Sequence, residues 1–532
     1  MMPVGRARSL FSVGVIVLLA AILRVIFFHG LAGMFPLDQA DYSRLAWQIT
    51  EGQWRYNEVF ELSTRWGLLF PTALSYRLFG INQISSALYP MLLSLGAVVV
   101  AYLTGRHLKG ERAGLLAALM IAFFPLETAL ASQLMNDGPL SFWLLLSLYL
   151  FLRGDDSRDS VTRRKFLLGC GLALGMAYAC KFVALLILPF FLLLTLIRRR
   201  IDWQWLWIAA GLLVIFSFDF AVFKYVSGDG LRRLHLLAED RSNSPAGLAA
   251  GTDRSPTALT VYLRWMFLEV HHTGLAFIAL AVIMFRQVVR RGAARAERPW
   301  PDGLLLLWSG TLWFVLSFYP LSLRPYIPLY KLANYMLMFT APLLVALGIR
   351  LSGCSRLFQA GCVGLILLSS LAGLVLTSAA QRVYVANTFR LHSFHESRHD
   401  RPLYCGMEDR AMLRYLDGYR SDASYIAYIS PGITLRPVPD RVDFRRGYVA
   451  LNRTFYFPER GYKYPPEITN PPAQWKVVVD EPENKCWLRE KGMTLVEALR
   501  KRGLISPALS DKVVARLNRA FPSDRLTIYA IE

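Results

Sequence analysis

The chain has 532 residues, of which 54% are hydrophobic, and its Lys and Arg residues exceed its Asp and Glu residues by 21 charges. So much apolar sequence in a chain of this length is not typical of a soluble protein, and it predicts a polytopic α-helical membrane protein. The basic residues gather in alternate connections between apolar segments, which favours membrane orientation over nucleic-acid binding as their role.

The first 382 residues contain apolar segments that predict about 11 membrane-spanning helices. In chain order these segments are 8–29, 84–104, 113–131, 138–152, 166–180, 182–197, 203–223, 261–285, 303–320, 332–350 and 357–379. The segments 166–180 and 182–197 are short, so we expect a tight hairpin broken at Lys181. Basic connections such as 163–165 and 198–200 place the amino terminus in the cytoplasm by the positive-inside rule, and an odd span count places the carboxyl-terminal region outside.

The first outer loop, residues 29–83, begins with two carboxylates, Asp38 and Asp41, directly after the first apolar segment. Their spacing of three places them on one face of a helix that starts near Leu37. A carboxylate beside the membrane can accept a proton from an attacking hydroxyl, whereas the structural alternative is that Asp38 caps the helix. The remainder of the loop predicts amphipathic helices that lie along the membrane and cover a cavity.

Other charged residues stand beside apolar segments. Asp137 lies in an outer Asn-Asp-Gly-Pro turn, where it can share a site with Asp38, although the turn sequence alone also explains it. Lys181 stands in apolar surroundings, where an ammonium needs a counter-ion or an interface, and a phosphate would satisfy it. Arg324 and Lys331 precede the tenth apolar segment and suit either lipid headgroups or a substrate phosphate.

Residues 383–532 are polar and read as one small soluble α/β domain on the outer side. Strand-like runs at 425–429, 475–479 and 526–531 are separated by helical patterns near 407–416, 495–502 and 511–520. Two of the six cysteines, Cys405 and Cys486, lie here. Export of the domain permits a disulfide between them, but the sequence leaves free thiols equally open.

Several patterns argue against other kinds of site. The sequence has no Gly-x-x-x-x-Gly-Lys-Ser/Thr loop, which argues against an ATP-driven pump. His271 and His272 are adjacent, and adjacent residues do not share one face of a regular helix, so we expect no metal site from this pair. His392, His395 and His399 are loosely spaced, and we expect them to be solvated.

A series of short motifs, taken in their order and spacing, resembles the C-type membrane glycosyltransferases related to protein O-mannosyltransferases and aminoarabinose transferases. The resemblance extends over residues up to about 350. The motifs are Asp38-Gln39-Ala40-Asp41-Tyr42, Arg65-Trp66-Gly67-Leu68-Leu69-Phe70-Pro71, Gly110-Glu111-Arg112-Ala113-Gly114, Asp137-Gly138-Pro139-Leu140-Ser141-Phe142, Gly175-Met176-Ala177 to Lys181, and Lys331 to Tyr335.

The resemblance implies a multi-span enzyme that passes a sugar from a polyprenyl-phosphate carrier to a lipid, glycan or protein acceptor outside the cytoplasm. It implies that Asp38 is the catalytic base and that Asp137 is a second acid that shapes the site or holds a metal. Many relatives have Asp-Glu where this chain has Asp38-Gln39, so a divalent cation stays open, and Asp41 can replace the missing charge. Direct displacement with one base predicts inversion at the anomeric carbon.

The same resemblance implies a set of residues near the carrier phosphate. They are Arg65, Lys181, Arg324, Lys331 and Tyr335. Relatives often have Arg-Tyr where this chain has Asn334-Tyr335, which weakens the phosphate assignment at that point. The expected partners are the lipid-linked donor, an envelope acceptor and membrane lipids, without nucleic acid.

Two other classes of protein remain open from the sequence. A transporter or flippase for a lipid-linked or anionic substrate would also need charged groups in the membrane, but the expected paired broken helices in matching halves are not seen. A non-catalytic scaffold would retain the fold and would tolerate Asp38→Asn. Compact loops favour a multi-pass protein of a bacterial inner membrane, with a cytoplasmic amino terminus and a periplasmic carboxyl-terminal domain.

Overall fold

The computed structural model describes residues 4–28, 38–54, 61–236, 260–291, 302–323, 326–329, 331–398, 401–420, 425–428, 443–455, 464–481, 486–520 and 525–532. The chain forms two compact units. The first unit comprises residues 1–28, 48–75 and 87–375, and the second comprises residues 29–47, 76–86 and 376–532.

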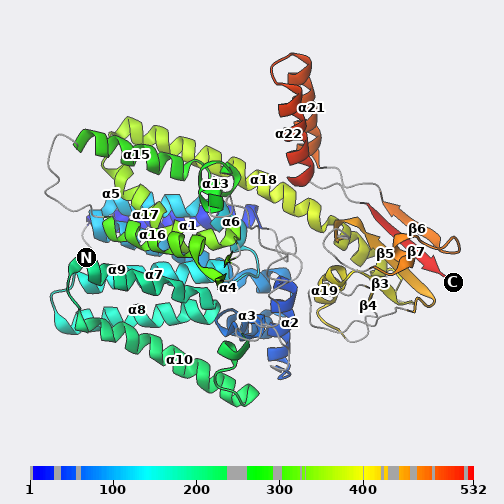
Figure 1. Cartoon of the computed structure of the whole chain (residues 1–532), viewed down its shortest axis with the longest axis horizontal. Coiled ribbons are helices and arrows are strands. Elements are labelled where there is room, and N and C mark those ends of the chain that lie inside the picture. Colours follow the sequence, from blue (N-terminus) through cyan, green and yellow to red (C-terminus); the bar gives the residue numbers. More distant parts are fainter. Residues whose placement is uncertain are drawn as a thin grey trace. The chain divides into compact units, whose positions relative to one another are not determined.

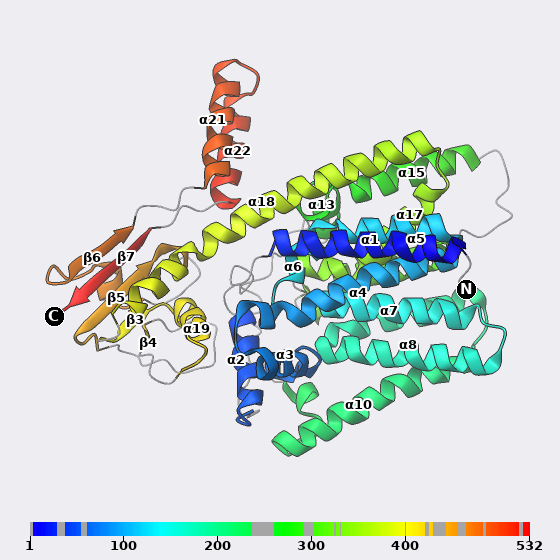
Figure 2. The same ribbon diagram turned by 180° about the vertical axis from the view of Figure 1, so that it is seen from behind.

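The first unit consists almost entirely of helices (Figures 1 and 2). Its helices, including those that continue into the second unit, are α1 (Val4–Ile26), η2 (Glu61–Thr64), α3 (Trp66–Phe79), α4 (Gln83–Lys109), α5 (Glu111–Ala122), α6 (Pro125–Ala131), α7 (Asp137–Asp155), α8 (Ser160–Cys180), η3 (Phe182–Ile187), α9 (Leu188–Arg198), η4 (Trp203–Trp205), α10 (Leu206–Ser227), α13 (Val261–Phe267), α14 (Val270–Thr273), α15 (Ala276–Arg291), α16 (Gly303–Phe318), η6 (Ala333–Met336), α17 (Leu337–Ser352) and α18 (Arg356–Glu396). A short antiparallel hairpin joins β1 (Pro320–Leu323) to β2 (Tyr326–Pro328).

Close helix packing in the first unit depends on small residues. Helices α7, α8 and α10 lie side by side (Figure 1). A Cβ atom on Gly171 of α8 would lie 2.0 Å from the carbonyl oxygen of Ile208, and one on Gly211 of α10 would lie 2.4 Å from that of Leu168. The backbones of α8 and α10 therefore touch directly, as small residues allow between membrane helices.

Four helices of the described residues are long and apolar enough to cross a membrane: Gln83–Lys109, Trp203–Ser227, Ala333–Ser352 and Arg356–Glu396. A fifth crossing is obtained if α5 and α6, which are bent by 59° relative to each other, form one broken span. Shorter apolar helices cover 11–26, 182–198, 276–289 and 303–318. The helical membrane class is therefore confirmed, whereas the count of eleven crossings stays a prediction.

Two local predictions have different outcomes. The break at Lys181 is confirmed, because α8 ends at Cys180 and Lys181 is extended, with φ −160° and ψ 130°. The expectation of one helix over 261–285 is wrong. This segment forms α13, α14 and α15, and Gly274, whose φ of +58° is in the left-handed region, ends α14.

The second unit contains a mixed five-stranded sheet in the order β4-β3-β5-β7-β6. Strand β3 pairs in parallel with β4 and β5, and β7 pairs antiparallel with β5 and β6. The strands are β3 (Leu403–Cys405), β4 (Tyr425–Ala427), β5 (Gly447–Asn452), β6 (Lys476–Glu481) and β7 (Leu526–Ile531). The helices are α2 (Asp38–Thr50), α19 (Met407–Leu416), η7 (Arg453–Phe455), α20 (Pro466–Thr469), α21 (Trp487–Lys501) and α22 (Pro507–Ala520).

The three strand-like runs of the sequence correspond to β4, β6 and β7, whereas β3 and β5 were not expected. Because the second unit also includes residues 29–47 and 76–86, the domain boundary at residue 383 stays a prediction.

The disulfide considered for Cys405 and Cys486 is not formed, because both are free, buried thiols. Cys405 lies in β3, and Cys486 precedes α21 after the edge strand β6. Strands β5 and β7 lie between β3 and β6 in the sheet.

Candidate active site

Side chains from three separate parts of the first unit meet at Asp137. The ammonium of Lys181 lies 3.1 Å from Asp137 Oδ1. The amide of Asn334 donates a hydrogen bond of 2.8 Å to Asp137 Oδ2. Lys181 Nζ also lies 4.3 Å from the centre of the Tyr335 ring, within the range of a cation–π contact. The structure therefore brings together Asp137, Lys181 and Tyr335, three of the residues that the sequence indicated.

This cluster is nearly closed to solvent. The exposed fractions are 1% for Asp137, 6% for Lys181 and 8% for Tyr335. A buried ion pair is tolerated only when its remaining polar atoms are also satisfied. Each carboxylate oxygen of Asp137 has a donor, one from Lys181 and one from Asn334. Asn334, which weakened the phosphate assignment in the sequence, instead completes the environment of the carboxylate.

The position of Lys181 follows from the way α8 ends. The Lys181 N–H donates to the carbonyl oxygen of Ala177 at 3.0 Å, after which the backbone becomes extended. Asn136, directly before the acid, donates from its side chain to the carbonyl oxygen of Cys180 at 3.1 Å. A Cβ on Gly67 of α3 would lie 2.8 Å from backbone atoms of Ala179 and Cys180. The hydrogen bond from Asn136 to Cys180 thus ties the residue before Asp137 to the residue before Lys181.

A second buried cluster fixes the last turn of α8. Asp219 of α10 accepts hydrogen bonds from Trp66 Nε1 at 2.6 Å and from the Tyr178 hydroxyl at 3.2 Å, and it pairs with Arg233 at 3.0 Å. Arg233 also donates to the carbonyl oxygen of Tyr178 at 2.7 Å. This cluster was not predicted from the sequence, although an acid inside the apolar run of α10 is a signal for it.

The other basic residues proposed from the sequence have different environments. Arg65 is buried and interacts electrostatically with Lys181. Lys331 donates to the carbonyl oxygens of Leu316 at 2.6 Å and Ser317 at 2.8 Å, near the carboxyl end of α16. Burial lowers the pKa of Lys331 to about 8. Lys331 is thus engaged by the end of a helix, where cations are stabilising. Arg324 lies outside the described residues.

Asp38 and Asp41 lie in the first turn of α2, so the prediction of a helix beginning at this point is confirmed. The Asp38 side chain is exposed, whereas Asp41 pairs with Arg44 at 3.2 Å. Within the second unit, Trp47 of α2 stacks on Tyr419 with ring centres 5.0 Å apart, which anchors the helix. The expectation that Asp38 shares a site with Asp137 stays a prediction, as does the position of this loop along the membrane.

The histidines differ from the expectations of the sequence. His395 is buried, and His392 lies 3.0 Å from Asp417, so the expectation that both are solvated is wrong. His399 lies outside the described residues. His271 and His272 were expected not to share one face, but their ring centres lie 3.9 Å apart. The regular helix assumed for that pair is replaced by the four-residue α14.

Comparisons with known proteins cover both sequence and fold. Residues 68–221 match the family model described as dolichyl-phosphate-mannose-protein mannosyltransferase, a stretch that contains Asp137 and Lys181. No curated protein sequence matches the chain.

Two solved structures are similar over most of the chain. The archaeal oligosaccharyltransferase AglB from Archaeoglobus fulgidus, in complex with an inhibitory peptide and a dolichol-phosphate, has a TM-score of 0.51 and 12% identity, over 99% of this chain and 88% of that chain. ArnT from Cupriavidus metallidurans in the apo state has a TM-score of 0.48 and 18% identity, over 76% and 74%. The likeness to AglB shows a shared fold, and with the family-model match the resemblance to the C-type glycosyltransferases is confirmed.

Proposed function

We propose that this protein transfers a sugar from a polyprenyl-phosphate carrier to an acceptor on the extracytoplasmic side of the membrane. The observation that carries the proposal is the buried Asp137–Lys181 pair with Asn334 and Tyr335 around it. Asp137 and Lys181 lie inside the stretch that matches a mannosyltransferase family model. AglB, which has a similar fold, was solved with a dolichol-phosphate, and this supports a lipid phosphate as the carrier.

The chemistry requires a cation at the leaving group. When the bond between sugar and phosphate breaks, the carrier phosphate gains negative charge. In the proposed reaction, the ammonium of Lys181 stabilises that charge, and the buried Arg65 adds a second positive charge nearby. Such contacts raise the rate only to the extent that they are stronger in the transition state than in the ground state. A charge that develops during the reaction satisfies this condition.

The acceptor hydroxyl needs a base, and we assign this role to Asp38. Its carboxylate is exposed at the start of α2, so it is accessible to an acceptor. Asp41 pairs with Arg44 and acts in this proposal as a second charge rather than as the base. Direct displacement with one base gives inversion at the anomeric carbon, and the configurations of donor and product test this point.

We assign no divalent cation to Asp137 in this proposal. Its carboxylate is already paired with the Lys181 ammonium and accepts a hydrogen bond from Asn334, so its charge is compensated without a metal. The proposed reaction therefore assigns no step to a metal at this position. Lys331, with Arg324 nearby in the sequence, is proposed to contact the headgroup region of the carrier.

The proposal includes a location and an architecture. We infer eleven membrane crossings, a cytoplasmic amino terminus and an extracytoplasmic α/β domain from residue 383 onward, in a bacterial inner membrane. The basic connections and the apolar segments of the sequence support this topology. The acceptor is an envelope lipid, glycan or protein.

The test is transfer from radiolabelled polyprenyl-phosphate-sugar to endogenous acceptors in membranes that contain wild-type protein or Asp38→Asn at matched expression. We expect the substitution to abolish transfer. Asp229→Asn is the matched control, because Asp229 is an acid of the first unit that pairs with His235 at 2.7 Å outside the cluster. Equal transfer in wild type and Asp38→Asn would remove Asp38 as the base. Carrier movement across the membrane without any transfer would replace the proposal with a flippase.

A further inference from the structure

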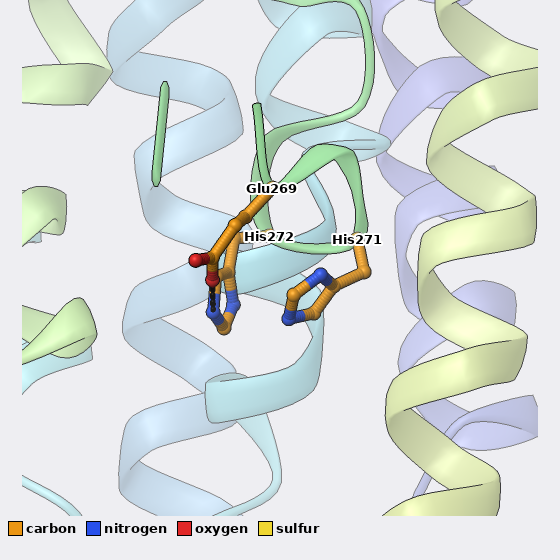
Figure 3. Close-up of side chains that lie close together, drawn as sticks. All are labelled: Glu269, His271 and His272. Atoms are coloured by element: carbon orange, nitrogen blue, oxygen red, sulfur yellow. Dashed lines mark ion pairs between the residues drawn. The ribbon is translucent and has the colours of Figure 1, made fainter. Parts of the chain in front are cut away.

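Glu269, His271 and His272 lie together where the chain passes from α13 to α14 (Figure 3). One potential ligand atom from each residue lies within 4.8 Å of the others. Glu269 Oε2 is 3.8 Å from His272 Nε2, which is longer than a hydrogen bond. A carboxylate and two imidazoles thus lie close to one point.

The local backbone explains how two adjacent histidines converge. Helix α14 has only four residues, with Glu269 before it at φ −102° and ψ 70°. A single turn does not impose the regular 100° separation of a longer helix on its first side chains. The chain therefore brings three polar side chains from residues 269–272 close together, which a continuous helix over 261–285 would not do.

The segment that carries this cluster is held by packing. The Thr273 hydroxyl donates to the carbonyl oxygen of Met266 at 3.1 Å, and the Leu275 N–H donates to the Ser369 hydroxyl at 3.0 Å. A Cβ on Gly373 of α18 would lie 2.8 Å from the carbonyl oxygen of His271. The backbone of the cluster is thus fixed against α13 and α18 before any ligand binds, which reduces the cost of ordering a site.

We propose that Glu269, His271 and His272 form a binding site for a transition-metal dication of the zinc class. Two imidazole nitrogens and one carboxylate oxygen are a donor set that suits Zn²⁺ and disfavours Mg²⁺ and Ca²⁺, which prefer oxygen ligands. Three protein ligands leave a fourth tetrahedral position for water or another small donor.

The distances allow this coordination after a small movement. Ligands at 2.0–2.1 Å from a tetrahedral ion are about 3.4 Å apart. The three ligand atoms lie within 4.8 Å of one another, so the largest closure that coordination would require is about 1.4 Å. Arg264 Nε pairs with Glu269 Oε1 at 3.2 Å, which orients the carboxylate and leaves Oε2 toward His272. Outer partners of this kind commonly orient metal ligands.

The cluster is also accessible to an ion. The side chains of Glu269 and His272 are 21% and 23% exposed, so the site is neither sealed nor freely solvated. The proposed site uses none of the residues assigned to sugar transfer, and it does not rest on the proposed function. A bound ion would link the side chains of this already packed connection between α13 and α15.

The experiment measures metal binding by the full-length, untagged protein in detergent. The protein is stripped with a chelator, and Zn²⁺ is titrated in competition with a chromophoric indicator, with stoichiometry measured by elemental analysis. We expect one Zn²⁺ per chain that excess Mg²⁺ does not displace. Substitution of Co²⁺ should give the visible absorption bands of tetrahedral coordination.

Variants decide whether these three residues are the ligands. We expect Glu269→Gln, which preserves side-chain size, and the double variant His271→Gln with His272→Gln to weaken Zn²⁺ binding by more than about tenfold. His235→Gln removes a more exposed histidine and should bind as wild type does. Size-exclusion profiles identify any variant that fails to fold, and Arg264→Met then tests the same carboxylate from outside the ligand set. Absence of stoichiometric binding, or equal binding by wild type and the histidine double variant, would overturn the proposal.

Discussion

Removal of the Lys181 ammonium should separate the structural role of the buried pair from its catalytic role. Lys181→Met leaves the Asp137 carboxylate buried with Asn334 as a remaining donor. Loss of one partner from a buried ion pair costs about 3–5 kcal/mol, because the other charge remains out of water. The double variant with Asp137→Asn removes both charges, and we expect it to recover most of that stability.

The rate of sugar transfer should not recover in the same way. If Lys181 stabilises the leaving phosphate, its loss removes one positioned electrostatic contact. Loss of such a contact typically lowers kcat by about 10²- to 10³-fold. Neutralising Asp137 restores no positive charge at the leaving group. The double variant should therefore be stable but slow.

The two quantities are measured on the same preparations. Thermal unfolding in detergent reports stability, and transfer from a labelled carrier, normalised to folded protein, reports the rate. Lys224→Met is the matched control, because Lys224 is an exposed lysine that donates to the carbonyl oxygen of Gly228 at 3.0 Å. Recovery of both stability and rate in the double variant would show that Lys181 has a structural role alone, and the phosphate assignment would fail.

Two further predictions concern the supporting structure. Burial raises the pKa of Asp409 to about 7 from 3.8, so stability that is fully present below about pH 4 is lost as the pH rises through 7. Asp409→Asn should remove this pH-dependent loss, which amounts to up to about 4 kcal/mol. The loss is measured as the decrease in hydrogen-exchange protection of β5 and α19 between low and neutral pH. Parallel pH profiles of wild type and Asp409→Asn would contradict the prediction. Gly67→Ala places a Cβ 2.8 Å from the backbone of α8 and should cost about 1–3 kcal/mol with reduced transfer. Gly310→Ala, with open space around its Cβ, is the control, and equal melting of the two variants would show that α3 does not constrain α8.

The sequence located the centre of the candidate site because charge in an apolar context is informative. Lys181 in apolar surroundings required a counter-ion or an interface, and in the structure its counter-ion is Asp137. The sequence suggested a phosphate for Lys181 instead, since nothing in the spacing shows that two residues 44 positions apart will meet. The helix break at Lys181 was also visible, because the short apolar segments 166–180 and 182–197 fit a chain broken between them better than one over-long helix.

Neutral polar residues were harder to place. Asn334 and Asn136 have central roles, but an amide in a loop has no energetic anomaly that marks it in a sequence. The same limit explains the omission of β5, whose six residues are all buried, so that it lacks the alternation by which half-buried strands are recognised. The assumption of a regular helix over 261–285 hid the convergence of His271 and His272, because the interruption depends on tertiary packing at Gly274 and Gly373.

The supporting contacts around α8 indicate that the ammonium is positioned before any substrate binds. Arg233 holds the carbonyl oxygen of Tyr178, Asp219 accepts from the hydroxyl of the same tyrosine, and Asn136 binds the carbonyl oxygen of Cys180. These contacts act on neighbouring residues of one helix turn, so they fix the backbone from which the Lys181 side chain extends. In the proposed reaction, a charge fixed in this way needs little reorganisation when the leaving phosphate develops its own charge, and such preorganisation is the main source of electrostatic catalysis. The buried residues of this turn are therefore expected to affect the rate of transfer through the position of Lys181, without contact with the sugar.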